Sequence, residues 1–183
     1  MSAAAATADI APVVTSRRRR PSAVAVGIAL IAFLLLVRIF VAEPFRIPSE
    51  SMAPTLKPGD QELVAKLGGH SPKRGQLVAF HSPRNGEVLL KRVVAVGGDT
   101  VGLEDGVLVV NRWPVREPFV NHEAIDSVYF GPVTVPPGTV FLMGDNRANS
   151  EDSRDFGAVR TSSIIGRAVA RVWPPSRWGT TTG

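Results

Sequence analysis

The fold is decided by one aliphatic run, Glu87-Val88-Leu89-Leu90-Lys91-Arg92-Val93-Val94-Ala95-Val96, which ends at Gly97-Gly98-Asp99. Such a run, closed by turn-forming residues, predicts a β-strand. Side chains alternate along a strand, so Lys91 shares a face with Leu89 and Val93, while Arg92 lies on the other face. Whichever face is buried therefore carries a cation. A lysine buried among aliphatic groups would have a lowered pKa, because a low-dielectric environment disfavours the ammonium form. The alternative is an edge-strand lysine that stays in solvent and prevents aggregation.

Short valine-rich segments recur along the chain, and each is bounded by turn formers. They predict further strands at Gln61–Leu67, Gln76–Phe80, Thr100–Leu103, Val107–Val110, Val133–Val135, Thr139–Met143 and Ala168–Trp173. Many short strands at close spacing predict an all-β fold, either a β-barrel or a pair of packed sheets. The section at about 105–135 breaks the pattern with Trp113, Pro114 and Pro118, so we expect a small insertion there.

The composition limits the chemistry that is available. A chain of 183 residues has room for one domain of ordinary size with short extensions. It contains no cysteine, which excludes thiol catalysis, disulfides and thiolate metal sites, and its three histidines are a poor basis for a metal centre. We therefore expect no metal and no cofactor. The net charge is +5, but Arg17–Arg20 supply four of these charges, so little remains to attract nucleic acid.

A long apolar segment follows the four arginines, because residues 23–42 contain a single charge, Arg38. Its length of about 20 residues matches the ~30 Å hydrocarbon core of a bilayer. We predict a transmembrane helix at 22–42, and the positive-inside rule then gives a disordered cytoplasmic tail at 1–21 and an extracytoplasmic domain at 43–183. A cleaved secretory signal is disfavoured by Phe40 at the −3 position of a cut after Ala42. A buried core helix is disfavoured by the arginine run and by Glu43-Pro44.

Two polar segments could carry chemistry beside the lysine strand. The first, Pro48-Ser49-Glu50-Ser51-Met52-Ala53-Pro54-Thr55-Leu56, directly follows the predicted helix and mixes hydroxyl groups with prolines. The alternative interpretation is an extended linker whose serines bond their own backbone. The second, residues 144–157, follows the apolar strand at Thr139–Met143 and is dense in Asp, Asn, Arg and Ser. It is either a solvated loop or a set of hydrogen-bonding groups held on a rigid sheet.

Together, these three segments resemble the bacterial type I signal peptidases, a family of Ser/Lys proteases. The motifs that carry the resemblance lie in the family's order, and the resemblance runs from about Glu43 to Trp178. The matching residues are Ser49, Ser51, Met52, Pro54, Thr55, Leu56, Lys91, Arg92, Gly97, Gly98, Asp99, Gly144, Asp145, Asn146, Arg147, Ser150, Asp152, Ser153, Arg154 and Gly157.

The resemblance implies a role for each matched residue. Ser51 would be the nucleophile and Lys91 the general base, which must be neutral at working pH and so needs a pKa lowered by about 3 units. The Ser49 hydroxyl and the Ser51 backbone N–H would form the oxyanion hole. Ser150 would orient the lysine. Two ion pairs, Arg92 with Asp145 and Asp152 with Arg154, would act as scaffold and hold the polar segment at 144–157 against the lysine strand.

The resemblance also implies a substrate and a location. The chain would be a membrane-bound serine endopeptidase of the bacterial cytoplasmic membrane that removes signal peptides from secretory preproteins after Ala-x-Ala sites. Shallow apolar pockets near Ile47, Leu56 and Leu89 would select small side chains. The bilayer would be a second partner, with Trp173 and Trp178 touching the lipid surface. The alternative for the tryptophans is burial of at least one of them in the core.

Other function classes fit the sequence less well. A self-cleaving Ser/Lys repressor protease would carry a DNA-binding domain and no membrane anchor. An inactive, membrane-anchored homologue acting as a chaperone or assembly partner would be expected to lack the nucleophile or the base, and both are present. A metalloprotease would need a His-Glu-x-x-His pattern, which the sequence does not contain.

Overall fold

The computed structural model describes residues 22–66, 71–120, 125 and 128–181. The chain forms two compact units, Met1–Leu34 and Leu35–Gly183. The predicted cytoplasmic tail at 1–21 lies outside the described residues and stays a prediction.

The helix α1 covers Ala23–Phe40, within the range predicted from the apolar segment. Its described apolar side chains are exposed, from Leu35 at 53% to Val24 at 71%. No helix among the residues that the structure describes combines the length and the apolar character needed to cross a membrane.

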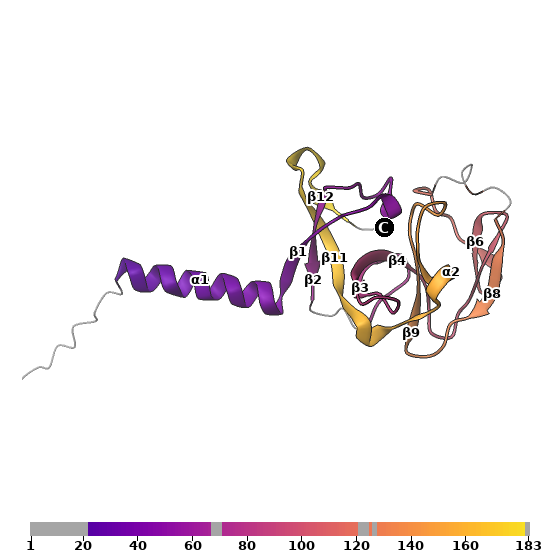
Figure 1. Ribbon diagram of the computed structural model, residues 1–183, viewed down its shortest axis with the longest axis horizontal. Coiled ribbons are helices and arrows are strands. Elements are labelled where there is room, and N and C mark those ends of the chain that lie inside the picture. Colours follow the sequence, from indigo (N-terminus) through magenta and orange to yellow (C-terminus); the bar gives the residue numbers. More distant parts are fainter. Residues whose placement is uncertain (1–21, 67–70, 121–124, 126–127, 182–183) are drawn as a thin grey trace, which may run out of the picture. The chain divides into compact units, whose positions relative to one another are not determined.

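The rest of the chain is built mainly of strands, in agreement with the predicted all-β fold (Figure 1). The larger sheet has the order β1-β2-β11-β3-β4-β9-β10, with β12 paired to β11, and every pairing is antiparallel. Its strands are β1 (Ala42–Arg46), β2 (Gln61–Ala65), β3 (Leu77–His81), β4 (Val88–Val96), β9 (Thr139–Met143), β10 (Val159–Arg160), β11 (Ile164–Trp173) and β12 (Gly179–Thr180). The lysine strand β4 is therefore an inner strand, between β3 and β9.

A smaller sheet has the order β7-β6-β5-β8. Its strands are β5 (Thr100–Glu104), β6 (Val107–Val110), β7 (Trp113–Pro114) and β8 (Phe130–Thr134). It overlaps the insertion predicted at about 105–135, although its first strand, β5, precedes that range. In Figure 1 its strands β6 and β8 lie beside β9, on the side away from β11.

The two sheets pack against each other through one hydrophobic cluster. Val94 and Ala95 of β4 and Phe141 and Met143 of β9 contribute from the larger sheet, and Val101, Leu103, Leu108 and Val110 contribute from the smaller one. Two further clusters lie on the larger sheet, one around Val78, Phe80 and Leu142 and one around Ile47, Met52 and Leu56. Both faces of β4 are therefore covered, and Lys91 and Arg92 are each only 3% exposed.

This burial decides between several of the alternatives. An edge-strand lysine held in solvent is excluded, because Lys91 is only 3% exposed. The segment at 48–56 is no extended linker, since it forms a short 3-10 helix, η1 (Glu50–Met52), and buries Met52 and Leu56. The expectation that at least one of Trp173 and Trp178 is buried is wrong. They are 52% and 67% exposed, because β11 ends in a surface turn at residues 174–178.

Candidate active site

The predicted nucleophile Ser51 lies in η1, at the end of the chain segment that follows β1. The turn is closed by the Ala53 N–H, which donates to Glu50 O at 2.9 Å, and its apolar residues Met52 and Leu56 anchor it in the core. Ser51 itself is half-buried, and the Ser49 hydroxyl donates to Ser51 Oγ at 3.2 Å. The two serines predicted to share a site are thus brought side by side.

The end of the nucleophile segment, at Thr55, is bound by charged residues. The Thr55 hydroxyl donates to Asp145 Oδ2 at 2.5 Å, and Arg171 Nη2 donates to Thr55 O at 2.6 Å. Arg171 lies 3.3 Å from carboxylate oxygens of both Asp60 and Glu62. The nucleophile turn is therefore fixed between the late loop and a cluster of ion pairs on β2 and β11.

Lys91 lies on β4 opposite Val78 of β3. Burial lowers its pKa from 10.5 to about 8, although the charges of Asp152 and Glu151 act in the opposite direction. A base with a pKa near 8 is partly neutral at physiological pH and can accept a proton from a hydroxyl group. The aliphatic surroundings predicted for this lysine thus produce the predicted direction of the shift.

The late loop, residues 144–154, meets the nucleophile turn at Gly144. A Cβ atom placed on Gly144 would lie 2.2 Å from Ser150 Oγ and 2.4 Å from Ser51 O. The Asn146 N–H donates to Ser51 O at 3.1 Å, and its side-chain amide donates to Glu50 O at 3.2 Å. Glycine is required at position 144 because any larger residue would push Ser51 and Ser150 apart.

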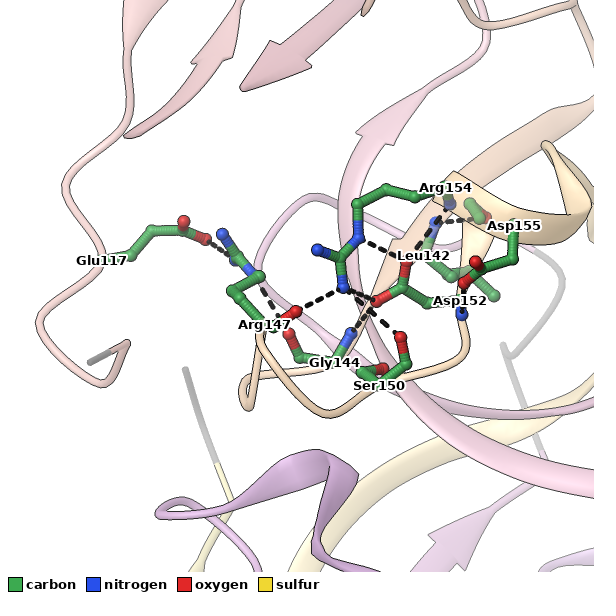
Figure 2. A network of polar contacts seen from close by, with 9 residues as sticks. Glu117, Leu142, Gly144, Arg147, Ser150, Asp152, Arg154 and Asp155 are labelled. Carbon is green, nitrogen blue, oxygen red and sulfur yellow. Dashed lines mark hydrogen bonds and ion pairs between the residues drawn. The ribbon is translucent and has the colours of Figure 1, made fainter. Parts of the chain in front are cut away.

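Two ion pairs, one buried and one partly buried, hold the late loop, and they join the residues predicted to pair. Arg92 donates to Asp145 through Nε at 2.8 Å and through Nη2 at 2.7 Å, which ties the loop to β4. Arg154 donates to Asp152 through Nε and Nη2, both at 2.9 Å, and to Arg147 O at 2.8 Å (Figure 2). Asp152 also caps the short helix α2 (Ser153–Phe156) and accepts from the Gly144 N–H at 3.0 Å. The late loop is therefore held by ion pairs and hydrogen bonds to buried groups and is not simply a solvated loop.

A small pocket of about 20 Å³ separates the nucleophile turn from the start of β4. Ile47, Leu89, Ser49, Ser51 and Lys91 are among its lining residues, so two of the three predicted pocket residues lie at the predicted site. The third, Leu56, is fully buried in the core cluster with Met52. A cavity of this size can hold about one water molecule or methyl group.

Sequence reasoning missed two buried acids. Glu117 pairs with Arg147 at 2.6 Å across 30 positions of sequence, and Glu62 is buried on β2 beside Arg171. The sequence offered no signal for Glu117, which stands between Arg116 and Pro118 and looks like a surface residue. For Glu62, its inward position in a strand that alternates buried and half-buried residues was a usable signal.

Comparison with known proteins identifies the family of the chain. A family model described as signal peptidase, peptidase S26, matches residues 20–173. A probable signal peptidase I-1 of Synechocystis sp. is 41% identical over 162 residues, which cover 83% of this chain and 81% of that protein. Signal peptidase I of Mycobacterium tuberculosis is 36% identical, with 97% of this chain and 80% of that protein covered. A crystal structure of a signal peptidase I from Enterococcus faecalis aligns with 34% identity and a TM-score of 0.47, over 53% of this chain and 96% of that chain. From the family model and these relatives, the chain belongs to the signal peptidase family, peptidase S26, and is a peptidase of the signal peptidase I type.

Proposed function

We propose that the chain removes N-terminal signal peptides from secreted preproteins with a Ser51/Lys91 dyad. The observation that carries this proposal is the buried lysine on β4, whose pKa of about 8 suits a general base and which lines the same pocket as Ser51. A serine hydroxyl is a weak nucleophile until a neighbouring base accepts its proton. Neutral Lys91 would take that proton as Ser51 Oγ attacks the scissile carbonyl carbon, and the ammonium group would then protonate the leaving amine.

The neighbouring serines suit two supporting roles. Charge develops on the carbonyl oxygen during attack, and the Ser51 N–H together with the Ser49 hydroxyl would stabilise it. The Ser49 hydroxyl is already 3.2 Å from Ser51 Oγ, so a short rotation about χ1 would direct it at the oxyanion. The Ser150 hydroxyl lies against Gly144, is buried and has no hydrogen-bond partner among the described residues, so it would be available to orient the Lys91 amine.

The shape of the site favours a substrate with small side chains. At Val88–Lys91, β4 pairs with β3, whereas its pairing with β9 begins only at Arg92, so the second edge of this part of β4 has no strand partner among the described residues. An extended peptide could pair with that edge and pass Ser51. The pocket of about 20 Å³ has room for an alanine methyl, which suits a small residue before the cut, as in Ala-x-Ala.

The apolar segment at 22–42, which extends beyond α1 at both ends, would anchor the enzyme in the bacterial cytoplasmic membrane as a single span. Its described side chains are exposed apolar groups, which a bilayer would cover. Arg17–Arg20 precede it and would stay on the cytoplasmic side by the positive-inside rule. The domain at 43–183 would then work on the extracytoplasmic side, where exported precursors emerge.

The test is cleavage of a preprotein with an Ala-x-Ala site by the purified full chain in detergent, with the cut mapped by mass spectrometry. We expect no cleavage by Ser51→Ala or by Lys91→Ala, while both variants keep the wild-type melting temperature to within a few degrees. Cleavage by either folded variant at a wild-type rate would refute the dyad. Cleavage by the wild type at a site without small residues would refute the proposed specificity alone.

A further inference from the structure

One segment next to the smaller sheet contacts two arginines that hold the late loop. Glu117 Oε1 accepts a hydrogen bond from Arg147 Nη2 at 2.6 Å. Two positions later, the ring of Phe119 lies 3.9 Å from Arg92 Cζ. Both residues belong to the stretch that follows β7. This stretch therefore makes two independent contacts with arginines that hold the late loop.

Arg147 connects Glu117 to the main chain of the late loop, at the centre of the site. Its Nε atom donates to Gly144 O at 3.0 Å. Gly144 lies against both the Ser150 hydroxyl and the Ser51 carbonyl, because a Cβ atom placed on it would meet both. Figure 2 shows the resulting series of contacts, from Glu117 through Arg147 to Gly144, with Ser150 beside it.

The Glu117–Arg147 pair is poorly suited to a role in stability alone. The two side chains are 3% and 0% exposed, yet Glu117 Oε2 and Arg147 Nη1 find no hydrogen-bond partner in the described part of the chain. Burying charges with unsatisfied atoms costs desolvation free energy that the ion pair recovers only in part. Such a pair still fixes one geometry, because breaking it would leave an uncompensated buried charge.

We propose that Glu117 is a positioning residue for the reaction. Through Arg147 it fixes the main chain at Gly144, and it thereby sets the Ser150 hydroxyl relative to Ser51 and Lys91. This inference rests on the proposed Ser51/Lys91 function, and it gives the residues next to the smaller sheet a part in catalysis.

Two variants of the full chain test the proposal with a peptide substrate. Glu117→Asp keeps the charge but withdraws the carboxylate by the length of one C–C bond, about 1.5 Å. The double variant Glu117→Leu/Arg147→Met replaces the buried pair with apolar groups of similar volume, a change that proteins often tolerate in stability. Because a displacement of about 1 Å can cost about 100-fold in rate, we expect kcat to fall 10- to 100-fold in each variant. KM should stay within about twofold, since the proposed peptide-binding edge of β4 is untouched.

The control is Lys66→Ala, which breaks the partly exposed ion pair between Lys66 and Glu43, 3.0 Å apart and outside the late loop. It should leave kcat and KM unchanged. Circular dichroism and the melting temperature identify which variants are folded, and if the double variant is unfolded, Glu117→Asp decides alone. Wild-type kcat in a folded variant, or a rise in KM at constant kcat, would overturn the positioning role. Activity in the Ser51→Ala variant would show that the proposed dyad is wrong. If Ser51→Ala is inactive but the Glu117 variants are fully active, only the positioning role of Glu117 is rejected.

Discussion

Replacing Lys91 with methionine should make the protein more stable while abolishing its activity. Lys91 is 3% exposed, and burial holds its pKa at about 8, below the ordinary 10.5. The folded protein therefore binds the lysine proton more weakly than the unfolded chain does. Methionine has a similar length and no charge, so it removes this penalty without opening a large cavity.

The size of the effect follows from the pKa difference. A difference of about 2.5 pKa units at ~1.36 kcal/mol per unit corresponds to a cost of about 3 kcal/mol for the ammonium form. Below pH 8 this cost is fully present. Between pH 8 and pH 10.5 the unfolded chain holds more protons than the folded one, so the stability of the wild type rises with pH through this window. The advantage of Lys91→Met should therefore shrink from about 3 kcal/mol at pH 7 to about 1 kcal/mol at pH 9.5.

Urea unfolding of the full chain at pH 7 and pH 9.5 measures both values. The matched control is Lys73→Met, because Lys73 is exposed and its replacement should change the free energy of unfolding by no more than about 0.5 kcal/mol at either pH. A Lys91→Met variant that is less stable than the wild type at pH 7 would refute the assignment of Lys91 as a desolvated amine. An equal stabilisation at both pH values would refute the titration of Lys91 as its cause.

Four further expectations concern activity and stability. The kcat/KM for a peptide substrate should rise with pH to a plateau, with an apparent pKa of about 8, since only the neutral Lys91 amine accepts a proton; a midpoint near 10 would contradict this. Arg154→Gln should raise the pH midpoint of kcat/KM, because Asp152 then favours the Lys91 ammonium form without a counter-charge. An unchanged midpoint would argue against an effect of Arg154 on the pKa of Lys91. Gly144→Ala should lower kcat about 100-fold by pushing Ser150 from Ser51, whereas Gly179→Ala, which meets no atom within 4 Å, should not change kcat. Burial raises the pKa of Glu62 above 4.5, so its charged form costs stability, and Glu62→Gln should increase the urea midpoint at pH 7 but not below pH 4.5.

The sequence predicted the inner strands of the larger sheet because their aliphatic residues are bounded by turn formers and contain no glycine, a pattern that the pair Lys91-Arg92 does not break. The strands at Val88–Val96 and Thr139–Met143 are examples. The first part of β11, Ile164–Arg167, was missed because Gly166 and Arg167 interrupt the apolar run. The structure gives the reason for this glycine, since a Cβ at Gly166 would lie 2.4 Å from Ala65 O on the neighbouring strand. A close approach between strands leaves no trace in a hydrophobic pattern.

The site was predictable where a residue's own neighbours determine its environment. Lys91 lies among aliphatic residues in sequence and also in space, so the lowered pKa could be inferred. Strand alternation predicts one buried face, yet Lys91 and Arg92 are both buried, because the smaller sheet covers the second face of β4. That covering layer, and with it the Glu117–Arg147 pair, depends on tertiary packing that no local pattern records.

The ion pairs of the late loop also affect the proton affinity of the base. The charges of Asp152 and Asp145 raise the pKa of Lys91, and Arg154 lowers it. Each carboxylate is bound by an arginine through two hydrogen bonds, and the field of such a neutral pair falls off faster with distance than that of a lone charge. Desolvation can therefore dominate at Lys91 although acids surround it. A substitution in either pair changes loop geometry and proton affinity together. Glu117 and Arg147 are not among the main charges acting on Lys91, so their pair is the cleaner probe of geometry alone.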